Sequence, residues 1–479
     1  MSGIAGIIET QDVSYPLYYA LHALQHRGQE AAGISTFDGE KAYLYKAPGQ
    51  LSEVFSEDRL RTLPGFCGVA QVLYTEKASR GKNENIQPLN FSFQGHQLSV
   101  SVSASLINSE SLRSEYEGKG HIFSTTSNAE IIAAIIAHEL IGGASPRDAF
   151  VRTLHRLEGA YTGVATLDGI LYAFRDPLGI KPLCFGKTER GYLVVSESVA
   201  LDITGAELVR DVEAGELLIF TKEAFESVQF AKAEHKAHCI FEYVYTARPD
   251  SVIDGVLVYD ARRRIGARLG KIPTEADLVS PVPDSGTAFA TGYSAESGIP
   301  YIEGLLKNRY VGRTFIMPGQ SKRENAVRMK LNPVRSHIKD KSVVLVDDSI
   351  VRGTTSLHIV DMVKEFGAKE IHMRIGSTPI IAPCYFGVDL PTREELIATN
   401  RSVEEIRETI HATTLEYISA EELVESVGIP AEDLCIACSC GEYPVDIPCE
   451  KCMKKRLLCW INSGFFFSKT DSKKRDCFI

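Results

Sequence analysis

The chain has 479 residues, of which 44% are hydrophobic, and a formal net charge of −10. That length predicts at least two domains with cores of their own, and the acidic balance argues against a general nucleic-acid-binding surface. No apolar run approaches the roughly 20 residues that cross a bilayer, and the N-terminus lacks a basic segment followed by an apolar one. We therefore expect a cytoplasmic protein that does not bind membranes.

The first half of the chain, up to about Thr221, alternates short strand patterns with glycine turns. Residues 191–196 and 215–220 are typical strands, and residues 13–26 and 128–140 have helical patterns. This mixture predicts sheets packed between helices. Residues 222–238 are polar and are expected to form a connector.

From about residue 239 the pattern changes to alternating strands and helices, which predicts a doubly wound parallel sheet. Residues 392–428 are charged and are expected to be helical. The most informative segment is 343–356, Val-Val-Leu-Val-Asp-Asp-Ser-Ile-Val-Arg-Gly-Thr-Thr-Ser. It predicts a buried strand, a loop and the start of a helix.

Such a loop places backbone N–H groups and the positive end of a helix dipole around an anion. The adjacent carboxylates of Asp347 and Asp348 can also hold a ribose diol and a hydrated Mg²⁺. Phosphate, ribose and Mg²⁺-bound diphosphate are the parts of 5-phosphoribosyl diphosphate (PRPP). The segment therefore predicts a PRPP site.

Cysteine is concentrated near the C-terminus, where seven of the eleven cysteines lie between Cys435 and Cys477. In a chain without an export signal, this bias favours metal or cluster ligation over disulfides.

Five further segments share the pattern of a known family: 239–251, 282–286, 308–316, 319–323 and 327–332. Together with 343–356 they resemble the phosphoribosyltransferase domain of the amidophosphoribosyltransferase family, which makes 5-phosphoribosylamine for purine synthesis. The resemblance implies an α/β domain of the type I phosphoribosyltransferase fold. It also implies PRPP and ammonia as substrates, purine nucleotides as feedback ligands and a homo-oligomer.

The resemblance carries roles onto individual residues of this chain. Ser285, Asp347 and Asp348 would lie at the Mg²⁺ ion. Lys322 and Arg323 would belong to a lid over the diphosphate. The PRPP-binding set comprises Asp347, Asp348, Ser349, Val351, Arg352, Gly353, Thr354, Thr355, Lys322 and Arg323.

The first half resembles the class II glutamine amidotransferase domain, an α+β sandwich of αββα layers with the N-terminal-nucleophile hydrolase fold. The supporting segments are 3–6, 24–33, 85–88, 175–183 and 196–198. These are mostly turn and packing residues, which carry fold more than chemistry.

The residues that the family uses to hydrolyse glutamine are replaced. Ser2 stands at the position of the cysteine nucleophile, and Leu73 at the arginine that clamps the glutamine carboxylate. Ser103 and Ala104 replace the oxyanion-hole pair, and Asn128 replaces an aspartate. A leucine cannot form a bidentate pair, and losing one oxyanion donor typically costs 10²–10³ in rate. We therefore expect the glutamine half-reaction to be lost, with ammonia taken free or from a separate glutaminase.

In one branch of the family a 4Fe–4S cluster joins the two domains. Its ligands match Cys239, Cys384, Cys435 and Cys438. The resemblance gives domains at 1–228 (amidotransferase-like) and 229–452 (transferase with cluster ligands), followed by a divergent tail, 453–479. This tail could be a docking segment, a disordered end or a sequence artefact.

Two functions of different classes remain open at this point. The first is an ammonia-dependent transferase, and the second is a non-catalytic paralogue that binds PRPP or nucleotides and regulates a partner enzyme. A transferase that uses a different amine is a third possibility. The intact segment 343–356 and the lid residues favour the first of these, the ammonia-dependent transferase.

Overall fold

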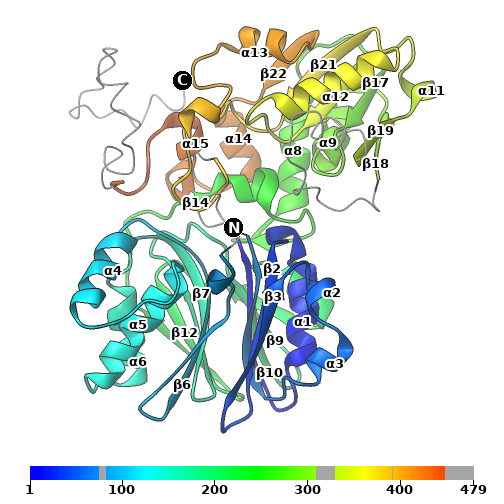
Figure 1. Ribbon diagram of the computed structural model, residues 1–479. Coiled ribbons are helices and arrows are strands. Elements are labelled where there is room, and N and C mark those ends of the chain that lie inside the picture. Colours follow the sequence, from blue (N-terminus) through cyan, green and yellow to red (C-terminus); the bar gives the residue numbers. More distant parts are fainter. Residues whose placement is uncertain (75–81, 309–329, 391, 448–479) are drawn as a thin grey trace.

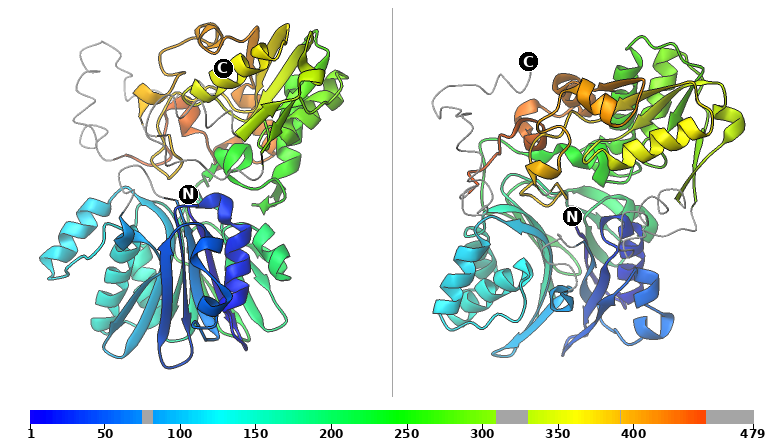
Figure 2. Two further views of the ribbon diagram at one scale, coloured as in Figure 1. Left: turned by 45° about the vertical axis from the view of Figure 1, so that its right-hand side comes forward. Right: turned by 45° about the horizontal axis from the view of Figure 1, so that its top comes forward.

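The computed structural model describes residues 1–74, 82–308, 330–390 and 392–447, and it has two lobes stacked end to end (Figure 1). In the lower lobe two antiparallel sheets face each other, and helices cover both outer faces (Figures 1 and 2). The predicted αββα sandwich is confirmed.

The first sheet has the order β11-β9-β10-β1-β4-β2-β3. Its strands are β11 (Glu207–Asp211), β9 (Cys184–Lys187), β10 (Gly191–Val195), β1 (Gly3–Glu9), β4 (Cys67–Leu73), β2 (Ala31–Phe37) and β3 (Ala42–Pro48). The second sheet consists of β13 (Phe225–Gln229), β12 (Glu216–Phe220), β8 (Ile170–Arg175), β7 (Gly159–Leu167), β6 (His96–Leu106) and β5 (Leu89–Phe93). Helices α1 (Ser14–Ala23), α2 (Leu51–Val54), α3 (Glu57–Leu60) and α7 (Val199–Thr204) cover the first sheet, and α4 (Ser109–Gly118), α5 (Asn128–Ile141) and α6 (Pro146–Leu154) cover the second.

Strand β6 shows how the sequence builds these layers. Its Leu98, Val100 and Val102 pack in the core beneath α5, as expected for alternate residues of a half-buried strand. The intervening serines face the first sheet, where the Ser99 and Ser35 hydroxyls are 3.1 Å apart.

The upper lobe is built on a parallel sheet in the order β17-β20-β21-β22. Its strands are β17 (Leu278–Pro281), β20 (Ser342–Asp347), β21 (Glu370–Ile375) and β22 (Thr414–Tyr417). Helices α8 (Val258–Gly270) and α9 (Thr287–Ser297) share a core with one face, and α12 (Thr354–Glu365) and α13 (Val403–Thr409) with the other. Short elements complete the lobe: β18 (Leu305–Lys307), β19 (Leu331–Pro333), α11 (Arg335–Ile338) and α14 (Ala420–Val427). The predicted doubly wound sheet is confirmed.

Two local predictions are wrong. Residues 222–238 contain β13, an edge strand whose side chains are mostly exposed. Its residues are mostly polar, so the sequence shows no alternating apolar pattern that would predict a strand. Residues 392–428 contain β22, a four-residue edge strand between the helices α13 and α14. Such a short edge strand buries too little to produce a strand pattern.

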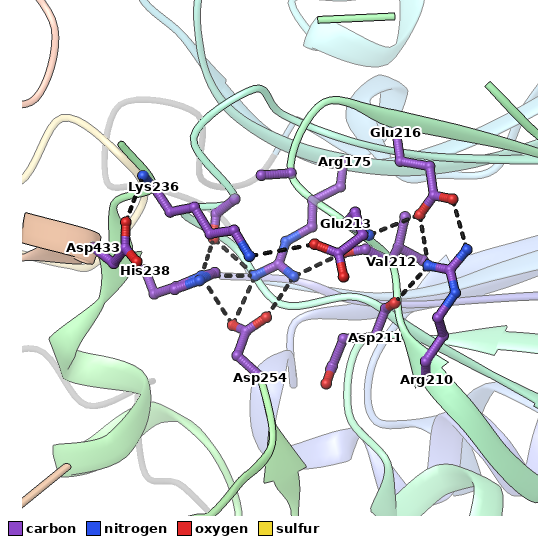
Figure 3. A network of polar contacts seen from close by, with 12 residues as sticks. Arg175, Arg210, Asp211, Val212, Glu213, Glu216, Lys236, His238, Asp254 and Asp433 are labelled. Atoms are coloured by element: carbon purple, nitrogen blue, oxygen red, sulfur yellow. Dashed lines mark hydrogen bonds and ion pairs between the residues drawn. The ribbon is translucent and has the colours of Figure 1, made fainter. Parts of the chain in front are cut away.

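The two lobes are joined by buried ion pairs. Arg27 is only 3% exposed and lies between Glu197 of the lower lobe, at 2.5 Å, and Glu242 of the upper lobe, at 2.6 Å. Glu242 begins a π-helix, Glu242–Thr246. A second network, around Arg175 and Asp254, lies beside the strand β14 (His238–Cys239) (Figure 3). In the described part of the chain, no helix is long and apolar enough to span a membrane.

Candidate active site

The predicted PRPP residues lie where the direction of the upper sheet's connections changes. From β17 the chain passes through α9 to a bridge between Val279 and Tyr301 on one side, and β20 lies on the other side of β17. The loop after β17 therefore leads to one face of the sheet, and the loop after β20 leads to α12 on the opposite face. Ligands of open α/β sheets bind in such a crevice at the carboxyl ends of the strands.

Asp347 and Asp348 lie in this crevice and are 7% and 5% exposed. Burial raises the pKa of Asp347 well above its ordinary value, and the adjacent Asp348 charge raises it further. Burial also raises the pKa of Asp348, while Ser285 and Ser349 donate hydrogen bonds to it. Two crowded carboxylates and a hydroxyl are hard oxygen donors, so the residues fit a Mg²⁺ ion that would relieve their repulsion.

The loop after β17 approaches β20 closely enough to require glycine. The Val282 amide donates to the Val346 carbonyl at 2.8 Å, and a Cβ at Gly286 would lie 2.2 Å from that same oxygen. This contact brings Ser285 to the two carboxylates.

The loop after β20 has the conformation of an anion cradle. Gly353 caps α12 with φ +76°, and a Cβ there would lie 2.4 Å from the Ile397 side chain. Thr354 and Thr355 are exposed in the first turn of the helix, where backbone amides lack the partners they would have further along a helix. Arg352 is exposed and pairs with Glu395 at 2.8 Å.

The structure thus brings together Ser285, Asp347, Asp348, Ser349, Val351, Gly353, Thr354 and Thr355 at one edge of the sheet. The predicted lid residues Lys322 and Arg323 lie outside the described residues.

In the lower lobe, Ser2 precedes β1, the central strand of the first sheet. Its hydroxyl accepts a hydrogen bond from the Tyr74 amide at 3.1 Å, and the side chain is 7% exposed. Leu73 ends the neighbouring strand β4 and pairs with Ala31 of β2. No charged side chain occupies either of these two positions.

The other replaced residues are integrated into the fold. Asn128, the first residue of α5, donates from its side-chain amide to the Ala104 carbonyl at 3.0 Å. An aspartate at position 128 would have no proton to donate to that carbonyl when ionised. Ser103 is buried on β6, next to Ala104. The substitutions therefore form a consistent local structure.

The four predicted cluster ligands line one apolar cavity at the junction of the lobes. Cys239 pairs with Cys435 between β14 and β23 (Leu434–Cys435), and Cys384 and Cys438 complete the set, the latter from α15 (Ala437–Cys440). Burial raises the pKa of all four thiols, and neighbouring thiols raise the pKa of Cys239 and Cys435 further.

Within the described ranges, no three His, Cys, Asp or Glu side chains are grouped as ligands of a single metal ion. A cluster does not need such convergence, because each of its four thiolates binds a separate iron. Four buried thiols around an apolar cavity fit that donor set.

Comparison with known proteins agrees with both lobes. Residues 76–202 match the family of glutamine amidotransferase domains. The amidophosphoribosyltransferase of Methanocaldococcus jannaschii is 46% identical over 94% of this chain and 99% of its own length. That of Bacillus subtilis is 43% identical over 93% of this chain and 94% of its own. The chain belongs to the amidophosphoribosyltransferase family.

Solved structures of the family give the same result. The glutamine PRPP amidotransferase of B. subtilis, complexed with ADP and GMP, superposes with a TM-score of 0.87 at 42% identity, covering 93% of this chain and 98% of that one. A structure described as the allosteric regulatory enzyme of purine biosynthesis superposes at 0.88, with 43% identity, 93% coverage of this chain and 96% of that one. As a member of this family, the chain is a pentosyltransferase.

Sequence reasoning missed some residues that support this amidophosphoribosyltransferase site. Arg262 of α8 is 2% exposed, donates to the carbonyls of Tyr243 and Ala247 at 2.8 Å, and acts electrostatically on Asp348. Gly286 was visible in its motif, but nothing in the sequence indicated the contact that requires it.

Proposed function

We propose that this chain transfers the phosphoribosyl group of PRPP to ammonia, giving 5-phosphoribosylamine and diphosphate. The observation that carries the proposal is the buried pair Asp347 and Asp348 at the crevice, beside the N-terminus of α12. Family membership supports the reaction, and it does not favour the alternative of a non-catalytic regulator.

The residues have separable tasks. The amides of residues 351–355 and the hydroxyls of Thr354 and Thr355 would hold the 5-phosphate at the helix N-terminus. Asp347 and Asp348 would hold the ribose hydroxyls and a Mg²⁺ ion, which supplies positive charge to the diphosphate. The crevice then positions ribose C1 for in-line attack.

Neutral ammonia needs no base for this attack. Its nitrogen forms the bond to C1 while the C1–oxygen bond to diphosphate breaks. We expect Lys322 and Arg323 to assist departure of the diphosphate as part of a lid.

We further propose that glutamine does not supply the ammonia. The lower lobe matches an amidotransferase domain, yet Ser2, Leu73, Ser103, Ala104 and Asn128 replace the family's catalytic and binding residues. Ammonia would come from solution or from a separate glutaminase.

We propose two inorganic cofactors, Mg²⁺ at the PRPP site and a 4Fe–4S cluster on Cys239, Cys384, Cys435 and Cys438. The four thiols in one apolar cavity support the second assignment. Protein purified without oxygen should be brown and contain about four irons per chain, as Cys₄ ligation of this cluster implies. Colourless protein with zinc on these thiols would contradict the assignment.

The resemblance also supports purine nucleotides as feedback ligands, because the B. subtilis structure is described as a complex with ADP and GMP. We further propose a cytoplasmic homo-oligomer, with an amidotransferase-like domain at 1–228, a transferase domain at 229–452 and a tail at 453–479.

One experiment tests the function directly. The protein is incubated with PRPP and Mg²⁺, with either ammonium at mildly alkaline pH or glutamine, and diphosphate release is measured. Release with ammonium but not with glutamine is the expected result. Binding of PRPP without release at any ammonium concentration would favour the regulator, and failure to bind PRPP would refute the site.

A further inference from the structure

Arg175, the last residue of β8, lies at the centre of a network of polar contacts (Figure 3). Its side chain is 2% exposed. The guanidinium donates at 2.8 Å to the carbonyls of Gly179, Lys181 and Val212. It also donates to both carboxylate oxygens of Asp254, at 2.8 and 2.9 Å. Arg175 therefore shapes the loop that follows it and binds the other lobe.

Asp254 belongs to the upper lobe. It lies in the turn between β15 (Val252–Ile253) and β16 (Val256–Leu257), immediately before α8. The same carboxylate contacts Nδ1 of His238 at 2.9 Å, and that ring nitrogen is 3.0 Å from the Gly179 carbonyl. The same nitrogen also lies 3.1 Å from the Arg175 guanidinium, so His238 belongs to the Arg175–Asp254 network.

This network adjoins the strand that carries the first cluster thiol. The Ala237 amide donates to the Leu178 carbonyl at 2.7 Å, and the Cys239 amide donates to the Ile180 carbonyl at 3.2 Å. The loop that Arg175 holds therefore forms the backbone hydrogen bonds that fix one edge of β14. On its other edge, β14 pairs with β23 and sets Cys239 opposite Cys435.

We propose that Arg175 and Asp254 are positioning residues of the cysteine cavity. They act together as a latch that holds Cys239 in register with Cys435 across the junction of the two lobes. The latch is a property of the chain itself. Its link to an iron–sulfur cluster rests on the cofactor proposed above.

The physical basis is the cost of separating a buried pair. Asp254→Asn leaves the buried guanidinium with only the more distant charges of Asp211 and Asp176. Arg175→Lys keeps the charge but loses the planar fork of donors, so either change should weaken the pair strongly. The loop 178–181 is joined by two backbone hydrogen bonds to the segment 237–239, which contains β14, a strand of only two residues. We therefore expect local opening of this strand before the sheets of either lobe open.

The test compares Asp254→Asn and Arg175→Lys with a matched control, Arg210→Lys. Arg210 lies in the same region and pairs with Glu216 at 2.7 Å, on the side away from His238 (Figure 3). Iron-free, reduced protein is treated with iodoacetamide, and the alkylation rate of each cysteine is measured by mass spectrometry. Cys67, buried in the core between the lower sheets, is the internal control for global unfolding.

The latch predicts that both variants raise the alkylation rates of Cys239 and Cys435 by about tenfold or more, corresponding to local opening, while Cys67 keeps its wild-type rate. Arg210→Lys should change neither. Unchanged rates at Cys239 would overturn the proposal. So would an equal rise at Cys67, because the pair would then stabilise the whole lobe rather than the cavity.

A second readout uses protein reconstituted with iron and sulfide. Visible absorbance and iron content should fall in both latch variants and persist in Arg210→Lys. Full retention in the variants would contradict the latch. If wild-type protein takes up no iron, the cluster assignment fails, and the alkylation rates alone then decide the latch.

Discussion

The two lobes present contrasting pockets on scaffolds of one family. In the upper lobe the carboxylates, the glycine-capped loop and the helix N-terminus that suit PRPP are all present. In the lower lobe the αββα scaffold is complete, but the side chains at the positions we propose to correspond to the family's glutamine site (2, 73, 103, 104 and 128) are uncharged. The fold of a domain can therefore be kept while the residues of its site change.

The reason lies in what each set of residues contacts. The strands of the lower lobe bury apolar side chains against helices and against each other, and Arg27 ties that lobe to the upper one. Loss of these contacts would unfold the protein. Ser2, Leu73 and Asn128 lie at or next to the ends of their strands and helix, and the fold accommodates them, as the hydrogen bond from Asn128 to the Ala104 carbonyl illustrates.

The sharpest way to test the upper pocket is Asp347→Asn. Removing one carboxylate should lower Mg²⁺-dependent diphosphate release about a thousandfold, because charge stabilisation by the metal is worth several kcal/mol. The control is Asp277→Asn at the opposite end of the sheet, where the exposed carboxylate accepts from the Ser342 amide at 2.8 Å. Comparable loss in both variants would show that the effect is structural.

The lower pocket is tested by glutamine. With PRPP and Mg²⁺ present, turnover with glutamine should be at least about a hundredfold below turnover with ammonium, as loss of the oxyanion donors implies. Ser2→Cys alone should not restore it, because Leu73 cannot bind the glutamine carboxylate. Glutamate release from glutamine is measured enzymatically. Release above background by the wild-type protein would refute the proposed loss of the glutamine reaction.

A smaller effect is expected at the phosphate loop. Gly353→Ala places a Cβ in the left-handed region at φ +76°, against Ile397, and should cost about 1–3 kcal/mol of stability. Gly298→Ala, at the end of α9, has nearly the same φ of +74° but nothing within 4 Å. Thermal unfolding should show a loss in both variants. Calorimetric titration should show weaker PRPP binding in Gly353→Ala alone, and equal binding in the two would disprove the cradle.

The smallest change is Thr355→Val, which removes one exposed hydroxyl. A hydrogen bond to a charged phosphate contributes about 1.5–3 kcal/mol, so PRPP affinity should fall by about tenfold to a hundredfold, with no change in thermal stability. Thr409→Val, at the far end of α13, serves as the surface control. Affinity unchanged from wild type would remove Thr355 from the binding set.

The sequence predicted both folds through the resemblance to a known family. It predicted the residues at the edge of the upper sheet from the segment 343–356, because a buried strand followed by a glycine loop leaves a strong local pattern. It missed β13 and β22, which are edge strands with little buried surface. It also missed Arg262 and the pairing of Arg175 with Asp254, which join positions far apart in the chain. The contacts of Arg262 depend on how the upper lobe folds, and the Arg175–Asp254 pair depends on how the two lobes dock, so a local sequence pattern indicates neither.

Arg27 has a practical consequence for anyone who wants to study one lobe alone. Its guanidinium lies between a carboxylate from its own lobe and Glu242 from the other, with almost no solvent access. Cutting the polypeptide between the lobes would expose Glu242 on one fragment and leave Arg27 with half its counter-charge on the other. Fragments expressed separately should therefore be poorly soluble, whereas two fragments produced in the same cell should reassemble and be recovered together.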